Sequence, residues 1–248
     1  MPAWNIKVDD SRTADTIITF IIFCEDEVCE VLYLKQFETA TTKINLIEKQ
    51  NASLTNVLNA IAHCQANGLL FPNEEQSERI ADDATQVWCV FDRDFNDGVN
   101  EQKGAIAFNE SIKLAKSKGF KVAWSNDAFE LWLLLHFEEV EPGDTGANRE
   151  YYYDRLTQIF LLLESENASL KRVQVEASFK YKSFLKTRKN FKSIVLVETA
   201  PLIGVAIERA KALEAHHNIA IKLPSEMIPC TMMHHLVFEL QRFGETTF

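Results

Sequence analysis

Two stretches of the chain are apolar without interruption and rich in β-branched and aromatic residues. They cover residues 16–24 and 86–91. Continuous apolar runs are typical of strands that are buried on both faces, whereas strands with one solvated face alternate apolar and polar positions. The pattern therefore predicts two central strands of a parallel sheet that is covered on both sides.

Helical patterns alternate with strand patterns in the first half of the chain. Ser53 is a plausible N-cap for the second helix, and a turn is expected around residues 96–98. Helices are expected over 28–38, 54–65 and 102–118, and shorter strands over 43–48 and 120–124. This alternation predicts the α/β class with a doubly wound, mostly parallel sheet, whose ligands bind beyond the carboxyl ends of the strands.

Beyond residue 126 the pattern becomes mainly helical. Residues 129–137 are apolar on nearly every side, which is typical of a buried helix, and a loop with proline and glycine follows over 141–148. Further helices are expected over 149–164, 201–216 and 231–243. Their apolar faces need the first half to cover them. We therefore predict an α/β core over residues 12–140 and a mainly helical extension over 141–248 that packs on it.

The charge balance limits how the chain could bind nucleic acid. Its formal net charge is -10, so a polyanion would have to be bound locally or through a metal ion. Residues 171–192, here called the basic strip, are the exception, with eight basic residues and a single acid. Such a strip is either a solvated helix face or a surface that faces phosphates.

The cysteines and the apolar runs indicate the cellular compartment. The five cysteines form no C-x-x-C pattern, and their odd number favours reduced core residues of a cytoplasmic protein. The longest apolar run, 17–24, is far shorter than the roughly 20 residues of a membrane helix, so no membrane segment or signal peptide is expected.

Acidic residues directly follow both buried strands. Glu25 follows the first, and Asp92 and Asp94 follow the second. Because the carboxyl ends of parallel strands meet at one edge, these side chains can share a site, and residues two apart project to the same side. Sites made only of anionic oxygens favour Mg²⁺ or Mn²⁺. The pattern predicts metal-assisted phosphodiester cleavage or another phosphoryl transfer.

Two other functions are compatible with the same residues. Phosphatases of the haloacid-dehalogenase type also use D-x-D after a strand, but there Thr or Val usually follows and here Phe95 does. A non-catalytic interaction subunit could use the acidic edge only to bind metal or a basic partner surface. Acids also occur in turns after strands without any function.

The histidines and glycines offer weaker signals. His216–His217 and His234–His235 lack partners at metal-ligand spacing, so we expect surface or interface roles for them. His136 ends an apolar helix and is expected to be a core or capping residue. The sequence has no Walker motif, which predicts that the chain does not hydrolyse ATP itself.

Three segments resemble RloB-like proteins, a branch of the Toprim nucleases associated with phage defence. Residues 23–30 with Tyr33 resemble C-E-G-E-x-x-E-x-x-Y/F, and residues 87–94 resemble V-W-x-V-F-D-x-D. Residues 125–137 are similar to S-N-P-x-F-E-x-W-L-L-L-H-F, the most specific match. Weaker matches at 181–182, 206–211 and 229–231 extend the resemblance over essentially the whole chain.

The resemblance implies a Toprim-like fold and a Mg²⁺- or Mn²⁺-dependent endonuclease. Glu25 would be the acid of the first strand, with Asp92 and Asp94 as the metal-binding pair. By similarity to the overcoming-lysogenization-defect nucleases, Glu30 and Glu130 would complete the acidic shell, with Glu30 as a further metal ligand.

Lys182 would stabilise charge on the scissile phosphate by the same resemblance, although Lys180 and Lys186 are near enough to leave the register open. Two residues depart from the family pattern, because Asp26 replaces the usual glycine and Asp127 the usual proline.

The resemblance also implies partners. The substrate would be DNA or RNA, including transfer RNA, and the chain would be a defence effector that a partner ATPase of the ABC or AAA type holds inactive until infection. A homo-oligomer is compatible with this arrangement.

Overall fold

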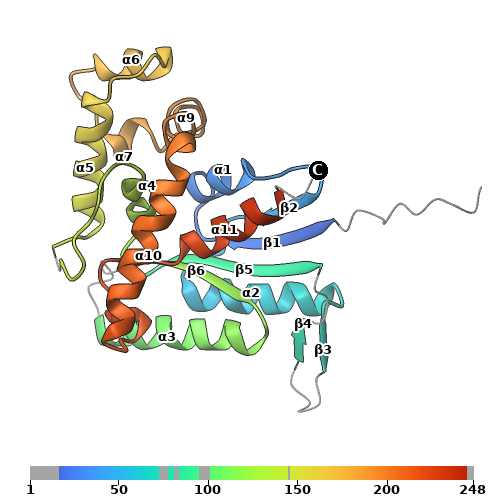
Figure 1. The fold of residues 1–248 in the computed structure, drawn as a ribbon. Coiled ribbons are helices and arrows are strands. Elements are labelled where there is room, and N and C mark those ends of the chain that lie inside the picture. Colours follow the sequence, from blue (N-terminus) through green and yellow to red (C-terminus); the bar gives the residue numbers. More distant parts are fainter. Residues whose placement is uncertain (1–16, 73–77, 81–83, 95–100, 145, 245–248) are drawn as a thin grey trace, which may run out of the picture.

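A mostly parallel sheet forms the centre of this computed structural model, which describes residues 17–72, 78–80, 84–94, 101–144 and 146–244. The strands lie in the order β2-β1-β5-β6-β7 (Figure 1). They comprise β1 (Ile18–Cys24), β2 (Thr42–Ile47), β5 (Thr85–Asp92), β6 (Lys121–Asn126) and β7 (Cys230–Thr231). The first four are parallel, and β7 is antiparallel to β6. The α/β class and the mostly parallel sheet that the sequence predicts are confirmed.

The two continuous apolar runs form the central strands β1 and β5. These strands pair in parallel, with Phe23 opposite Cys89 and Cys24 opposite Val90, so they end side by side. Residues 20–24 and 87–91 are buried, which removes both faces of these strands from water. This paired ending brings the residues that follow β1 and β5 to the same edge of the sheet.

Helices cover both faces of the sheet. One face is covered by α2 (Ser53–Ala66) and α3 (Glu101–Ser117), and the other by α1 (Cys29–Lys35) and α11 (Met233–Gly244) (Figure 1). The predicted N-cap of α2 is wrong by one residue, because Ala52 precedes the helix and no side chain caps it.

The second half of the chain adds a helical layer above the sheet (Figure 1). The buried helix α4 (Glu130–Phe137) packs against α10 (Ile203–Ile219) and α5 (Arg149–Leu162). Between α5 and α10 lie α6 (Ala168–Gln174), α7 (Tyr181–Phe184), α8 (Arg188–Asn190), a π-helical turn (Phe191–Val195), α9 (Leu196–Thr199) and a 3-10 turn (Ala200–Leu202). A further 3-10 turn covers Pro224–Glu226.

Two features of the sheet region were not predicted. A small antiparallel pair, β3 (Leu70–Pro72) with β4 (Glu78–Ile80), follows α2. The fifth strand β7 comes from the segment expected to be mainly helical, and its Thr231 pairs with Ser125 of β6. The last strand of the sheet and helix α11 therefore both come from the C-terminal part of the chain.

The buried side chains of both halves form one hydrophobic core. The cysteines belong to it, and all five are free and buried, as the sequence predicts. One helical run, 188–219, is long and apolar enough by composition to cross a membrane. Ile194, Val195 and Ala206 of this run are buried in the same core, and 33% of its most apolar window is buried.

Some predictions concern residues outside the described ranges. They are residue 16 of the first strand, the turn around residues 96–98 and the start of the predicted core at residue 12.

Candidate metal centre

The acids that follow β1 and β5 meet at the carboxyl edge of the sheet. Glu25 comes directly after β1, and Asp92 is the last residue of β5. The backbone N–H of Asp92 donates to Oε2 of Glu25 over 3.1 Å. The parallel pairing of the two strands is what brings these residues together, although 67 positions separate them.

Two further acids reach the same edge from helices. Glu30 lies in the first turn of α1 and Glu130 is the first residue of α4, and both are buried. Electrostatic repulsion couples each of them to Asp92. The structure thus brings together all five predicted carboxylates, here called the acidic cluster: Glu25, Glu30, Asp92, Asp94 and Glu130.

Burial and mutual repulsion disfavour the charged forms of Glu25, Glu30 and Asp92. Burial, reinforced by repulsion from Glu30 and Glu25, raises the pKa of Asp92 well above its usual range. Burial and repulsion from Glu25 act in the same direction on the pKa of Glu30. Burial also raises the pKa of Glu25 to about 7, although the hydrogen bond from Asp92 opposes this shift. The cluster therefore needs positive charge to be fully ionised.

Two basic side chains supply part of that charge. Nη2 of Arg149, the first residue of α5, lies 3.3 Å from Oδ2 of Asp92 and also pairs with Asp94. Lys186 places Nζ 2.7 Å from Oε1 of Glu130. Nε of Arg149 is buried without a hydrogen-bond partner among the described residues. Sequence reasoning missed Arg149, because a single arginine at a helix start carries no pattern.

Lys186, not Lys182, contacts the acidic cluster. Lys182 is exposed and pairs with Glu150 at 3.3 Å. Both lysines lie over the ring of Tyr153, with Nζ 4.9 Å from its centroid for Lys182 and 5.3 Å for Lys186. The sequence left the register between these lysines open, and of Lys182 and Lys186 it is Lys186 that pairs with Glu130.

The two departures from the family pattern have local structural roles. The carboxylate of Asp26 accepts hydrogen bonds from the backbone N–H groups of Glu27 at 2.7 Å and Cys29 at 2.6 Å, which stabilises the start of α1. Oδ2 of Asp127 accepts from the N–H of Arg149 at 3.0 Å and so positions α5.

The acidic cluster fits a hard divalent cation. Its ligands would be oxygens only, and their repulsion in a buried setting shows a deficit of positive charge. In the structure as described, the guanidinium of Arg149 occupies the position between Asp92 and Asp94 that a cation would favour. Glu25, Glu30, Asp92 and Asp94 are the residues able to hold such an ion.

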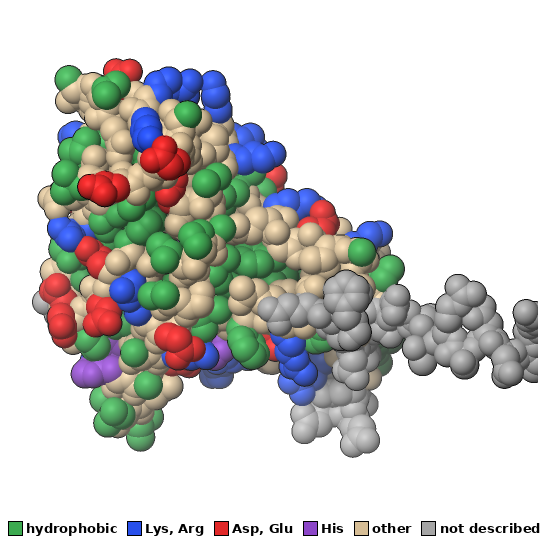
Figure 2. Space-filling view, turned by 45° about the horizontal axis from the view of Figure 1, so that its top comes forward, with side chains coloured by type: hydrophobic (Ala, Val, Ile, Leu, Met, Phe, Trp, Pro, Cys, Tyr) green, Lys and Arg blue, Asp and Glu red, His purple; other side chains and the backbone are tan. Residues whose placement is uncertain are grey.

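The basic strip lies beside this centre. Seven of its eight bases are exposed, and Lys186 is half-buried against the acidic cluster. Arg188 donates to the carbonyl oxygen of Glu27 at 2.9 Å, which ties the strip to the loop after β1. Figure 2 shows Lys and Arg side chains gathered over the upper part of the molecule, where α5, α6 and α9 lie in Figure 1.

The histidines divide into core and clustered residues. His136 is buried, with Nε2 3.0 Å from the Tyr33 hydroxyl, as expected of a core residue. The prediction that His234 and His235 lack partners is wrong, because Nε2 of each lies 2.9 Å from Oε2 of Glu214. The sequence could not show this contact, because Glu214 comes from a different helix.

One known family matches the sequence of this chain. A family model described as RloB-like protein matches residues 20–240, nearly the whole chain. The chain therefore belongs to the RloB-like family. No curated protein and no solved structure gives a significant match.

Proposed function

We propose that this member of the RloB-like family is a metal-dependent endonuclease that hydrolyses phosphodiester bonds in DNA or RNA as the effector of an anti-phage defence system. The observation that carries the proposal is the convergence of five carboxylates at the carboxyl edge of the sheet, where parallel α/β folds bind ligands. The resemblance of residues 87–94 and 125–137 to RloB-like proteins, which implies a Toprim-type nuclease, supplies the reaction class.

Glu25, Glu30, Asp92 and Asp94 would hold Mg²⁺ or Mn²⁺. Such a cation, when bound, supplies a water of lowered pKa and neutralises charge that develops on the phosphate. Binding of the cation would favour the ionised forms of Glu25, Glu30 and Asp92, whose pKa values burial raises in the metal-free protein, and would so release protons.

The exposure of the cluster indicates where a phosphate would approach. The side chain of Asp94 is 34% exposed and that of Asp92 14%, whereas that of Glu130 is 3% exposed. We therefore expect a phosphate to approach from the side of Asp94, where Arg149 pairs with both aspartates. Its planar guanidinium suits bidentate contact with phosphate oxygens once a cation has replaced it between the two aspartates.

Lys186 would assist from the inner side. Its ammonium is paired with Glu130, which favours the charged form and holds it beside the acidic cluster, where it would stabilise charge on a bound phosphate. The exposed basic residues of the basic strip would contact neighbouring phosphates. They would provide a local binding surface for nucleic acid on a chain whose net charge is -10.

The test is cleavage of supercoiled plasmid and of total cellular RNA by the purified protein with Mg²⁺ or Mn²⁺, beside EDTA. We expect metal-dependent cleavage that is lost in Asp92→Asn and kept in Glu110→Gln, a matched change of an exposed acid on α3. Cleavage that survives in Asp92→Asn would contradict the proposal. So would intact DNA and RNA both for the protein alone and for its complex with a co-purifying ATPase.

A second candidate is a non-catalytic interaction subunit of an ATPase-containing complex. The pairing of Arg149 with both Asp92 and Asp94 favours it, because this pairing neutralises the metal-binding pair from within the chain. Under this alternative Asp92→Asn would leave defence in cells intact, whereas the endonuclease proposal expects its loss.

A further inference from the structure

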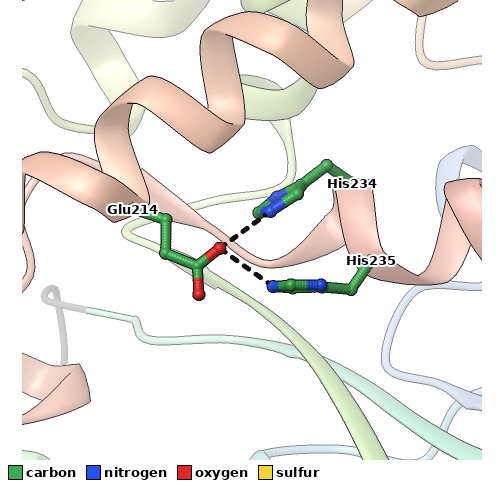
Figure 3. Close-up of side chains that lie close together, drawn as sticks. All are labelled: Glu214, His234 and His235. Atoms are coloured by element: carbon green, nitrogen blue, oxygen red, sulfur yellow. Dashed lines mark hydrogen bonds and ion pairs between the residues drawn. The ribbon is translucent and has the colours of Figure 1, made fainter. Parts of the chain in front are cut away.

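A second group of ligand-type side chains lies between helices α10 and α11. Glu214 belongs to α10, and His234 and His235 belong to the first turn of α11. Nε2 of each histidine lies 2.9 Å from the same oxygen, Oε2 of Glu214 (Figure 3). The three side chains can offer ligand atoms within 4.8 Å of one another.

His234 has two hydrogen-bond acceptors as partners, but its neutral imidazole has only one N–H to donate. Its Nδ1 lies 3.1 Å from the carbonyl oxygen of Thr231, and its Nε2 faces the carboxylate of Glu214. Both partners are acceptors when Glu214 is ionised, yet a neutral imidazole carries a single N–H. One of the two contacts then sets a nitrogen lone pair against an oxygen, inside a site where His234 is buried.

A metal ion at Nε2 would remove this conflict. The N–H would then be on Nδ1 and donate to Thr231, which is how metal-binding histidines are commonly oriented. Zinc binds imidazole nitrogen and carboxylate oxygen at about 2.0–2.2 Å, so ligand atoms of one ion lie roughly 3 Å apart. The two distances of 2.9 Å from Oε2 of Glu214 to the histidine nitrogens match that requirement, and all three ligand atoms lie within 4.8 Å of one another.

We propose that Glu214, His234 and His235 bind a divalent transition-metal ion of the zinc class, at a site separate from the acidic cluster. Two imidazole nitrogens and one carboxylate oxygen suit zinc, whereas Mg²⁺ prefers oxygen ligands alone. The ion would link α10 to α11 and so fasten the last helix to the helical layer.

The site keeps an open side. Glu214 and His235 line a pocket of about 510 Å³ whose walls include Trp88, Trp124 and Phe238. Three protein ligands leave a fourth zinc position vacant, and a water molecule from this pocket would fill it.

The test is competition for zinc between the purified full chain and a chromophoric chelator, followed by Co²⁺ substitution and its visible absorption. We expect one ion per chain. Affinity should fall by at least about 100-fold in Glu214→Gln and in His235→Gln, since even outer partners of metal ligands cost 10- to 100-fold. His216→Gln, an exposed histidine on the same helix, should change nothing.

His235 keeps the test decisive, because its side chain is 52% exposed and its replacement should not unfold the protein. Asp92→Asn should keep full zinc binding, which separates this site from the proposed endonuclease centre. Absence of zinc binding, or equal affinity in wild type, Glu214→Gln and His235→Gln, would overturn the proposal. The contacts of both histidines with Glu214 would then be hydrogen bonds only.

Discussion

The acidic cluster and the Glu214–His234–His235 group both lack positive charge or protons for their acceptor atoms, but the acceptor atoms differ. Each gathers hydrogen-bond acceptors without enough protons or cations to satisfy them. The acidic cluster uses only carboxylate oxygens and takes partial relief from Arg149 and Lys186. The second group uses two imidazoles and one carboxylate. Because the chemistry of the ligand atoms selects the cation, we expect a hard ion at the first site and a borderline one at the second.

The two sites also differ in how the fold assembles them. Glu25 and Asp92 lie at one edge because parallel strands end together. Glu214 meets His234 only because α10 packs against α11. A general rule of topology determines the first site, and the packing of two particular helices determines the second.

Asp92→Asn should separate function from stability in the acidic cluster. We expect cleavage to fall by about 1,000-fold, within the range for losing a group that stabilises transition-state charge. The free energy of unfolding should stay equal or rise, because the change removes a buried carboxylate that its neighbours repel. Urea denaturation beside the cleavage assay checks both. A parallel loss of activity and stability would show that Asp92 mainly supports the fold.

Zinc should stabilise the protein only through the second site. At a free concentration 1,000 times its Kd, an ion that binds only the folded state adds about 4 kcal/mol to the free energy of unfolding. Thermal unfolding with and without zinc measures this gain, which we expect to vanish in Glu214→Gln and to persist in Asp92→Asn. A gain that disappears instead in Asp92→Asn would place the zinc at the acidic cluster and erase the distinction between the sites.

The pH dependence of stability should show a buried imidazole and the acidic cluster acting in opposite directions. Burial lowers the pKa of His136 from 6.5 to about 4, so its contribution is complete above pH 6.5 and is lost as pH falls toward 4. The loss amounts to about 3 kcal/mol. The carboxyl of Glu25, with its pKa raised to about 7, instead stabilises the fold below its unfolded pKa of 4.5 and loses that contribution as pH rises through 7.

Urea denaturation between pH 4 and 8, in wild type and in Glu25→Gln, tests these opposite signs. The variant should lose more stability than wild type as pH falls from 7 to 4.5, because only the opposing carboxyl has been removed. Identical profiles would mean that Glu25 does not titrate with a raised pKa in the folded protein.

Replacing Lys186 and replacing Lys182 should affect cleavage differently, although both residues belong to the basic strip. Lys186→Met should lower cleavage by about 30-fold, close to 2 kcal/mol, because it removes the ammonium held beside Glu130. Lys182→Met is the matched control, since that side chain is exposed and pairs with Glu150. We expect Lys182→Met to change the cleavage rate by less than about threefold, because exposed ion pairs contribute little free energy. The reverse order of effects would restore Lys182 as the phosphate-binding residue.

Much of the fold was predictable because its signals are local. The apolar runs over 16–24 and 86–91 predicted the central strands, and the alternation with helices predicted a parallel sheet. The strand β7 was not predictable, because two residues show no periodicity and Thr231 joins the sheet only by pairing with Ser125. The Toprim assignment and the cytoplasmic location remain predictions.

The candidate site divides in the same way. The five carboxylates of the acidic cluster were found from their positions after strands and within family motifs. Arg149, Lys186 as the contacting lysine, and the partners of His234 were not. Arg149 starts a helix 57 positions after Asp92, and Lys186 lies 56 positions after Glu130.

The sequence by itself determined the class of the fold, the family, and the acids that meet at the carboxyl edge of β1 and β5. These follow from short-range patterns, because strand burial and strand direction are set by neighbouring residues. Only the tertiary structure decided which basic side chains, Arg149 and Lys186, pair with the acidic cluster. It alone also brings Glu214 to His234 and His235. Contacts of about 3 Å between distant segments depend on how helices pack, and no spacing along the chain encodes that distance.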